Sequence, residues 1–494
     1  MPSFQDLFVF EIANNHGGSV AHAQYIIDKL SETTRRHSIN AAVKFQYRDL
    51  DTLIHPDYRN STENKHILRF NSTRLTSDEF YGLVSYVKER EMIAICTPFD
   101  ENSVSLCEDH GIDIIKIASC SATDYPLLER VSKSQKPVIV STGGKSIAEI
   151  DNIYNFFVHR DVNFAFLHCI GIYPAQNSQL QLNCIERMIN RYPEITVGYS
   201  GHEEPDNTLV AQMAVAKGAK IFERHVGHAT GEISLNAYST EVDDIEQWVF
   251  AVIEAQNICG DKNKKSISEV ETKSLRELSR GCFCAKPVRK GDVITRDSVF
   301  FAMPCNSGQT TSGQYQENMI ASKNYEAGEE VIEKRKTSII TDTRSIIHDI
   351  KGMLFESKVV IGKDFELELS HHYGMEHFRS VGATVISIVN REYCKKIVIV
   401  LPGQKHPMHY HKLKEETFQV LSGVLNIQLE SEIFYIHPGE ILTVERGVRH
   451  AFTSVDGCIF EEISTTHKIN DSFYDDPGVL KIDVMNRKTI LKEW

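Results

Sequence analysis

The sequence predicts an α/β protein made of a closed (β/α)₈ (TIM) barrel, a small β-rich unit and a C-terminal all-β domain. Three observations predict this organisation. Short apolar runs alternate with amphipathic helical stretches from residue 8 to about residue 260. A turn-and-strand pattern then occurs twice between residues 276 and 336. Finally, apolar and polar residues alternate with a period of two over residues 345–465, which is typical of a β-sandwich or barrel.

The composition is that of a globular protein with several domains. The 494 residues are too many for one ordinary domain, and 41% hydrophobic with 24% charged residues is typical of soluble proteins. The net charge of −13 argues against nucleic-acid binding. No apolar run approaches the roughly 20 residues that span a bilayer. The first 18 residues lack a basic region, so no signal peptide and no membrane partner are predicted.

The cysteines indicate the cytoplasm. Their number, 11, is odd, their spacing is irregular, and most lie inside apolar runs. This pattern is typical of reduced, buried thiols in a cytoplasmic protein. The pair Cys282 and Cys284 has no matching second pair, which argues against a structural metal site there.

Eight apolar runs are predicted to form the barrel strands, with helices between nearly all of them. The predicted strands are 8–13, 41–46, 92–98, 113–119, 137–142, 163–168, 195–200 and 220–225. Strand–helix alternation implies parallel strands with right-handed crossovers, and eight units in about 250 residues match a closed barrel. An open doubly wound sheet is the alternative, which the number of repeats alone does not exclude. The polar stretch Arg48–Thr76 is predicted to be a long loop over the barrel mouth.

Polar side chains collect at the carboxyl ends of the predicted strands, where such folds place their chemistry. They are Glu11, Asn15, His16, Lys44, Gln46, Thr97, Lys116, Ser119, Ser141, Thr142, His168, Ser200, His202, Glu223 and His225. A lysine inside an apolar strand is costly unless it meets an anion. A single lysine of this kind can also reach solvent from a sheet edge. Two of them, Lys44 and Lys116, with hydroxyl groups nearby, predict a phosphate or carboxylate ligand.

Two histidines are predicted to lie side by side. His202 and His225 each follow an apolar run, and a helix-length segment, 206–217, separates these runs. Neighbouring parallel strands would therefore carry both imidazoles at the same end. Neutral imidazoles held on rigid backbone can bind a divalent metal, whereas one histidine alone would more often pack or cap. The pair therefore favours a metal site.

The predicted domains are 1–260, 276–340 and 341–494. Residues 261–275 are charged and poor in apolar side chains, so they are predicted to be a linker. The repeated pattern at 287–295 and 325–333 places a glycine at a turn before an alternating strand. A unit of about 60 residues is marginally stable alone and is expected to dock on another part.

Taken together, the barrel motifs resemble the sialic acid synthase family. Those enzymes condense phosphoenolpyruvate with an open-chain hexosamine to make a nonulosonic acid. The matching strings are Glu11–Gly18, Val43–Gln46, Cys96–Phe99, Ile115–Ser119, Ser141–Gly144, Leu167–Cys169, Tyr173–Pro174, Gly198–His202 and Glu223–His225. Residues 276–336 resemble the antifreeze-like (SAF) domain that follows the barrel in that family. The resemblance covers about two thirds of the chain.

The resemblance implies roles for the polar residues. A divalent metal, Mn²⁺ or Mg²⁺, would be bound by His202 and His225. The phosphoenolpyruvate contacts would be Lys44, Thr97, Lys116, Ser119 and Ser200, and the other substrate-binding positions are Tyr173 and Asn236. Glu11 would face the sugar, and Glu11, Glu223 and His16 are candidates for proton transfer, among which the sequence does not choose. The resemblance also implies a homodimer in which the small domain of one subunit closes the barrel of the other.

Four positions depart from the family pattern. A serine, Ser121, stands where the family usually has an acid, and Gly171 stands where it has an asparagine. Met303 aligns with an arginine that reaches the N-acyl group of the sugar, and Asn236 aligns with an aspartate. The phosphoenolpyruvate and metal end is thus kept while the sugar end is changed. The sequence therefore predicts an acceptor aldose other than N-acetylmannosamine.

Two other interpretations of the whole chain stay open. One is a different barrel lyase or aldolase that acts on pyruvate-like substrates. A Schiff-base aldolase would need a nucleophilic lysine and no metal, which the paired histidines argue against. The other is a non-catalytic scaffold, a hypothesis that the departures at Ser121 and Met303 keep open.

The C-terminal strings resemble the two cupin motifs. The first runs from Gly403 to Gly423, and the second runs from Gly439 to His450 with Glu445 in place of the usual proline. Their metal-ligating residues are His409, His411, Glu416 and His450, so a second divalent metal is predicted. The string around Lys414 also resembles lyxose-isomerase-type cupins. The sequence leaves open whether this domain isomerises a sugar or only binds a metal.

Overall fold

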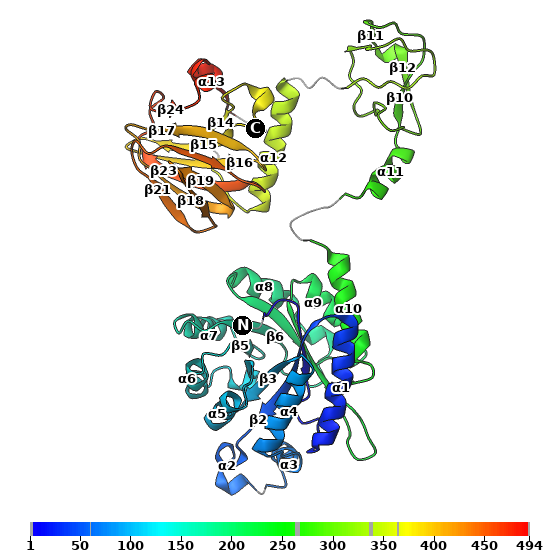
Figure 1. The fold of residues 1–494 in the computed structure, drawn as a ribbon, viewed down its shortest axis with the longest axis vertical. Helices are drawn as coiled ribbons and strands as arrows, with labels where there is room; N and C mark the ends of the chain where they lie inside the picture. Colours follow the sequence, from blue (N-terminus) through cyan, green and yellow to red (C-terminus); the bar gives the residue numbers. More distant parts are fainter. Residues whose placement is uncertain (1–2, 60, 262–266, 335–338, 363–364, 493–494) are drawn as a thin grey trace. The chain divides into compact units, whose positions relative to one another are not determined.

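The computed structural model describes residues 3–59, 61–261, 267–334, 339–362 and 365–492. The chain divides into two compact units, Met1–Ser266 and Ile267–Trp494. Each unit is described by itself (Figure 1). Among the described residues, no helix is both long and apolar enough to cross a membrane.

Eight parallel strands of the first unit close into a barrel (Figure 1). They are β1 (Leu7–Glu11), β2 (Asn40–Tyr47), β3 (Ile93–Pro98), β4 (Ile114–Ile117), β5 (Val138–Ser141), β6 (Phe164–Cys169), β7 (Thr196–Gly201) and β8 (Ile221–Gly227). Each strand pairs with the next, and β1 also pairs with β8, which closes the cylinder. A short strand, β9 (Thr240–Glu241), extends the pairing from β8. This closure confirms the predicted barrel and excludes an open sheet.

Helices follow the strands as the alternation predicts. The main ones are α1 (Val20–His37), α4 (Ser77–Glu89), α5 (Glu101–Asp109), α6 (Tyr125–Lys133), α7 (Ile147–Val158), α8 (Asn183–Arg191), α9 (Leu209–Ala216) and α10 (Ile245–Cys259). Several begin at an N-cap. In α7, for example, the Ser146 hydroxyl accepts a hydrogen bond from the Glu149 N–H while the Glu149 carboxylate accepts one from Ser146. This capping box satisfies backbone donors that a helix start leaves unpaired.

The barrel strands bury both faces, and the two faces form separate apolar clusters. In β1, Phe8 and Phe10 belong to the large cluster shared with the helices, and both pack against Trp248 of α10. Leu7 and Val9 belong to a smaller cluster with residues such as Ile95, Ile139 and Ile221. Because successive side chains of a strand point to opposite faces, this smaller cluster fills the barrel interior.

The predicted loop Arg48–Thr76 is partly helical, which corrects the sequence prediction. It contains α2 (Leu50–Leu53) and α3 (Lys65–Ser72). Asn64 caps α3 by accepting hydrogen bonds from two backbone N–H groups. A small apolar cluster of Leu50, Ile54 and Ile67 holds the segment together. Helices of 4 and 8 residues are too short to show the periodicity by which helices are recognised in a sequence.

The predicted linker 261–275 contains a helix that the sequence did not predict. Helix α11 (Glu269–Leu278) occupies its second half, and the Ser268 side chain caps that helix by accepting from the Glu271 N–H. Residues 262–266 lie outside the described part of the chain. None of the α11 residues is buried, so the helix lacks the apolar face by which an amphipathic helix is recognised in a sequence.

The small β-rich unit contains two short antiparallel pairs. Strand β10 (Gly281–Cys284) pairs with β12 (Val299–Ala302), and β11 (Val293–Ile294) pairs with β13 (Met319–Ile320). The two copies of the repeated pattern meet where Val288 and Tyr325 exchange backbone hydrogen bonds of 2.9 and 2.8 Å. Cys282 and Cys284 are free thiols in the apolar core of this unit.

The last part of the chain is a β-sandwich preceded by α12 (Ile339–Glu356). Its strands are β14 (Glu366–Ser370), β15 (Ala383–Asn390), β16 (Tyr393–Val400), β17 (Lys405–Tyr410), β18 (Glu416–Gly423), β19 (Leu425–Leu429), β20 (Glu432–Ile436), β21 (Ile441–Val444), β22 (His450–Thr453), β23 (Cys458–Thr465), β24 (Phe473–Tyr474) and β25 (Lys488–Leu491). They form a seven-stranded and a five-stranded antiparallel sheet. Phe418, Phe452 and Phe460 pack between the sheets. Thus the predicted all-β domain is confirmed.

We expect Gly198→Ala to destabilise the barrel by about 3 kcal/mol, because the added methyl group would overlap the Ile221 carbonyl oxygen and the Leu167 side chain. Urea unfolding followed by circular dichroism would measure this loss. Gly82→Ala is the matched control, since Gly82 lies in α4 with nothing within 4 Å of the added methyl. It should raise stability by about 0.5–1 kcal/mol. Equal effects of the two substitutions would contradict the packing argument.

Candidate active site

Strand periodicity aims one set of polar side chains into the barrel. In β1, Glu11 shares its face with Leu7 and Val9, which fill the interior. In β4, Lys116 shares its face with Ile114 of the same cluster. The same period of two carries Lys44, Thr97, Ser141, Ser200, Glu223 and His225 inward above the interior cluster. These residues therefore meet at the carboxyl ends of the strands.

Lys44 is bound between two carboxylates. Its Nζ lies 2.7 Å from Glu11 Oε2 and 2.7 Å from Glu223 Oε2, and all three side chains are buried. Gln46 donates to Glu11 Oε2 at 3.2 Å, and Ser200 donates to Glu223 Oε1 at 2.8 Å. Burial alone would lower the pKa of Lys44, but the two carboxylates raise it above its usual value. Lys44 is therefore a permanent cation at the barrel mouth.

Lys116 is the second buried cation of the network. Its Nζ donates to Ser141 Oγ at 2.6 Å and lies 3.8 Å from Glu223 Oε1. Burial lowers the pKa of Lys116, and the nearby Glu223 only partly offsets this effect. Burial by itself would raise the pKa of Glu223, but Lys116 and Lys44 hold it far below its usual value. With Glu11 included, two cations and two anions balance at the centre of the site.

His202 and His225 lie side by side next to this network, with ring centroids 5.4 Å apart. His202 Nδ1 donates to the Ile170 carbonyl oxygen at 3.0 Å, which leaves Nε2 with its lone pair. His225 Nδ1 is buried and has no hydrogen-bond partner among the described residues. Burial lowers the pKa of each histidine to about 3, so both rings are neutral at physiological pH. Two neutral imidazoles with free lone pairs fit a divalent cation.

Two tyrosines form a wall beside the histidines. The Tyr173 ring lies 4.4 Å from the His202 ring, and the Tyr238 ring lies 4.9 Å from His225 and 6.1 Å from His202. The two tyrosines are 5.2 Å apart. Tyr173 was predicted as a substrate-binding residue, whereas Tyr238 was not. Tyr238 lies in the irregular segment after β8, where the sequence carries no periodic signal.

A cleft of about 850 Å³ opens over the ends of β4, β5 and β6, and Ser119, Cys169, Gly171 and Tyr173 are among its lining residues. The Ser119 hydroxyl accepts from the Gly143 N–H at 3.0 Å and lies 3.1 Å from Cys169 Sγ. A Cβ atom added at Gly171 would meet nothing within 4 Å. The space that an asparagine side chain would fill at this position is therefore open. Thr97 Oγ1 is buried without a hydrogen-bond partner among the described residues and thus can bind a ligand.

Two predicted residues lie outside the lysine–glutamate network. His16 is buried and packs against Phe80, and its Nδ1 accepts from the Gly18 N–H at 3.1 Å. Burial lowers the pKa of His16 to about 4. The Asn236 amide oxygen accepts a hydrogen bond from Arg69, a residue that the sequence did not single out. Arg69 lies on α3, one of the helices that the sequence did not predict.

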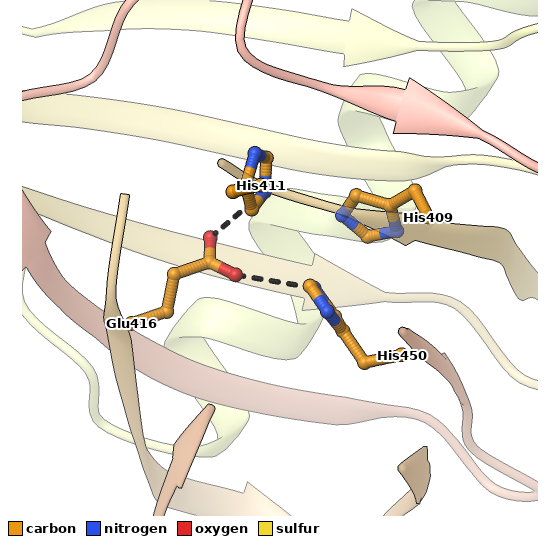
Figure 2. A group of neighbouring side chains, drawn as sticks. All are labelled: His409, His411, Glu416 and His450. Carbon is orange, nitrogen blue, oxygen red and sulfur yellow. Dashed lines mark ion pairs between the residues drawn. The ribbon is translucent and has the colours of Figure 1, made fainter. Parts of the chain in front are cut away.

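The predicted cupin ligands form one tight group (Figure 2). One ligand atom from each of His409, His411, Glu416 and His450 lies within 4.8 Å of the others. The two oxygens of Glu416 lie 3.5 Å from His411 Nε2 and 3.1 Å from His450 Nε2. His409 of β17 is the pairing partner of His450 of β22, so sheet register brings these two together.

Backbone carbonyl groups orient the three cupin imidazoles. The Nδ1 atoms of His409, His411 and His450 donate to the carbonyl oxygens of Pro407, Asp471 and Val448 at 3.0, 2.5 and 3.2 Å. Because a carbonyl oxygen only accepts, each Nδ1 carries the proton and each Nε2 keeps its lone pair. Such a group of three nitrogens and one carboxylate suits a divalent metal.

A buried lysine competes for the cupin carboxylate. Lys414 contacts Glu416 directly and lies 3.1 Å from Glu462 Oε1. Burial would lower the pKa of Lys414, but Glu462 and Glu416 raise it above its usual value. Glu416 is correspondingly held well below its usual pKa by Lys414, against the opposing effect of burial. Both groups are therefore charged at neutral pH.

Known proteins resemble the first two thirds of the chain. Human N-acetylneuraminate-9-phosphate synthase is 25% identical over 299 residues, which are 59% of this chain and 81% of the human protein. The N,N'-diacetyllegionaminic acid synthase of Campylobacter jejuni is 28% identical over 256 residues, which are 50% of this chain and 74% of that enzyme.

A solved structure from Chromobacterium violaceum, described as a spore coat polysaccharide biosynthesis protein E, is 40% identical with a TM-score of 0.63. It covers 66% of this chain and 98% of its own. The cupin domain model matches residues 396–458, and the NeuB family model matches residues 36–264. The chain therefore belongs to the NeuB family of sialic acid synthases and carries a C-terminal cupin domain.

Proposed function

We propose that the barrel condenses phosphoenolpyruvate with an open-chain aldose to give a nonulosonic acid and phosphate. The observation that carries this proposal is the meeting of Lys44 and Lys116 with Glu11 and Glu223 beside the paired histidines. The relatives support the class of product, because their names are those of sialic, legionaminic and pseudaminic acid synthases.

Phosphoenolpyruvate carries a phosphate and a carboxylate, which two lysines with hydroxyl donors suit. Lys44 and Lys116 supply the cations, Ser200 supplies a hydroxyl group beside Glu223, and Ser119 supplies one in the adjoining cleft. Thr97 has an unused hydroxyl group that would add a further hydrogen bond. Phosphoenolpyruvate would thus bind to lysines that the fold already buries and holds in place.

The same site would hold a divalent cation, Mn²⁺ or Mg²⁺, on His202 and His225. The two nitrogens leave most of the coordination shell to oxygen atoms of substrate and water. When bound, such a cation would act as a Lewis acid towards the aldehyde oxygen of the sugar. Neutral imidazoles are required for this, and burial keeps both rings neutral.

The reaction balances as follows. The methylene carbon of phosphoenolpyruvate forms a bond to the aldehyde carbon, water adds to the neighbouring enol carbon, and the carbon–oxygen bond to phosphate breaks. Of the two protons of that water, one ends on the former aldehyde oxygen, which becomes a hydroxyl group, and the other leaves with the phosphate. Lys116 and Lys44 hold the pKa of Glu223 far below its usual value, so Glu223 is neither a proton donor nor an effective base, and its part is to position Lys44 and Ser200. Glu11 is placed to act on the sugar side through its contacts with Lys44 and Gln46. His16, bonded to Gly18, plays no direct part in this scheme.

The acceptor is an aldose other than N-acetylmannosamine. This proposal rests on the empty space at Gly171 and on an amide at Asn236 in place of a carboxylate. The family resemblance adds a homodimer in which the small β-rich unit of one subunit covers the barrel of its partner. The identity of the acceptor and the proposed dimer both concern the end of the site where the sugar would bind, not the phosphoenolpyruvate end.

The proposed function is tested by incubating the protein with phosphoenolpyruvate, Mn²⁺ and a mixed pool of aldoses and then measuring product masses. We expect a product equal to one aldose plus the pyruvate unit, with one phosphate released. Cleavage of phosphoenolpyruvate without a new carbon–carbon bond would favour another lyase, and no consumption would favour a scaffold. Fastest turnover of N-acetylmannosamine would refute the proposed acceptor.

Lys44→Gln should raise the KM for phosphoenolpyruvate about a hundredfold, because it removes charge-assisted hydrogen bonds and leaves two carboxylates facing the substrate. The measurement is phosphate release at varied phosphoenolpyruvate concentration. Lys220→Gln is the matched control, because Lys220 lies next to the first residue of β8, at the other end of the barrel, and pairs with Asp6 at 3.5 Å. An unchanged KM in Lys44→Gln would contradict the assigned role.

Chelation of divalent cations should abolish product formation, and added Mn²⁺ should restore it. The double variant His202→Gln with His225→Gln should lose Mn²⁺ binding at the barrel, which isothermal titration calorimetry measures directly. His159→Gln, a histidine at the end of α7, provides the control. Retention of full cation affinity in the double variant would place the cation elsewhere.

The cupin domain supports a second candidate activity, isomerisation of a sugar. The oriented imidazoles favour it, because a metal that they would hold could polarise the oxygen atoms of a sugar bound beside the Lys414–Glu462 pair. A binding module that holds a metal without turnover stays the alternative. The two differ in one respect: only an isomerase changes which precursor sugars give product.

The variant His409→Ala with His411→Ala should lower the bound metal by one equivalent per chain, measured by elemental analysis after dialysis against Mn²⁺. The exposed His437→Ala is the control. If the domain is an isomerase, some precursor sugars should no longer give product in the double variant. Unchanged products from every precursor would favour the binding module, and unchanged metal content would contradict the site itself.

A further inference from the structure

Arg69 is held at the sugar end of the site by uncharged groups. It donates through Nη1 to the Asn236 side-chain oxygen and through Nη2 to Asn15 Oδ1 at 3.4 Å. Asn15 is itself fixed, because its amide donates to the Val226 carbonyl oxygen at 2.9 Å and to Ser239 Oγ at 3.2 Å. The guanidinium is therefore held by two amide oxygens, each on a different loop of the barrel mouth.

No carboxylate pairs with Arg69 within the described ranges of the chain. The two acids at the centre of the site, Glu11 and Glu223, are both bound to Lys44. A guanidinium group does not lose its proton in proteins, so the charge of Arg69 is left uncompensated. This contrasts with the centre of the site, where two lysines and two glutamates cancel.

A second guanidinium lies in the same segment. Arg48 lies between the rings of Phe70 and Phe99, with its guanidinium carbon 4.0 and 3.9 Å from their centroids, and donates to Gln46 Oε1 at 2.6 Å. Burial lowers the pKa of Arg48 to about 10, which still leaves it protonated at neutral pH. Gln46 bonds to Glu11 in turn, so Arg48 approaches the reacting centre from the same side.

Arg69 is hydrogen-bonded to the segment that carries Tyr238, one of the two tyrosines beside the histidines. Asn236, which accepts the hydrogen bond from Arg69, is two positions from Tyr238. Burial and His22 lower the pKa of His16, with Arg69 adding to the effect. Tyr238 is the residue whose ring packs on both His202 and His225. Arg69 is thus bonded to the segment whose Tyr238 packs on the proposed metal ligands.

We propose that Arg69 binds an anionic group, a carboxylate or a phosphate, on the acceptor aldose and so determines which sugar reacts. This inference rests on the proposed function of the barrel. Asn236 is the second residue that this inference requires. An aspartate at this position, as in the family pattern, would form an ion pair with Arg69 and neutralise its charge. The amide holds the guanidinium in place and leaves its charge for the substrate.

The test compares three acceptors with phosphoenolpyruvate and Mn²⁺: N-acetylmannosamine, its 6-phosphate and the corresponding uronate. We expect one of the two anionic sugars to have the lowest KM, and which of them does distinguishes phosphate from carboxylate. Arg69→Gln should raise the KM for that sugar about tenfold or more, with the KM for phosphoenolpyruvate and for the neutral sugar unchanged. Arg69→Lys should restore part of the effect.

Lys65→Gln is the matched control, because it removes the same charge from an exposed position of the same helix, α3. Asn236→Asp should also weaken the anionic sugar, through a new ion pair with Arg69, even though the arginine is still present. Equal KM values for neutral and anionic sugars, or an Arg69→Gln variant that behaves like Lys65→Gln, would overturn the inference.

Calorimetric titration of the anionic sugars separates this inference from the proposed function. Binding that depends on Arg69, without consumption of phosphoenolpyruvate with any aldose, would refute the condensation and leave the anion site standing. Condensation of neutral aldoses with no dependence on Arg69 would support the proposed function and refute the anion site. Circular dichroism of each variant shows that the barrel is folded.

Discussion

The barrel site depends on a lysine that is bound between two glutamates. A lone ammonium group or a lone carboxylate at the depth of Lys44, Glu11 and Glu223 would be strongly destabilising, and none of them is stable there without the others. The three side chains come from β1, β2 and β8, and β8 lies beside β1 only because the sheet closes. Barrel closure and the charged centre therefore require one another.

This balance also explains how the site can receive a trianionic substrate. Because Lys44 and Lys116 are paired with Glu11 and Glu223, the further positive charge that the proposed substrate phosphoenolpyruvate needs would come from a cation on the paired imidazoles and from polar hydrogens along the cleft. Rigid placement matters more than net charge here, since dipoles and charges that need not reorganise are the main source of electrostatic catalysis. The two guanidinium groups at the sugar end add charge where the acceptor, not phosphoenolpyruvate, would bind.

The sequence predicted the parts of the molecule in which burial has a regular period. The eight barrel strands lie within a few residues of their predicted positions, and the polar residues at their ends follow from the same alternation. The cupin ligand group was also predictable, since His409, His411 and Glu416 lie close together along the chain. Short or unburied elements were not predictable: α2, α3 and α11 bury too little surface to impose a pattern. Arg69 and Tyr238 were missed for a different reason. Only the folded chain brings Arg69 to Asn236 and Tyr238 to the two histidines.

The short segment after β8 contacts both Arg69 and the paired histidines, which limits how the sugar specificity can change. Asn236, which orients the guanidinium, is two positions from Tyr238, which packs on the paired imidazoles. Remodelling this segment for a new sugar would therefore disturb the metal ligands at the same time. Helix α3 comes from a separate part of the chain and meets this segment through the Arg69 side chain, so we expect evolutionary drift and laboratory selection alike to alter sugar choice there first.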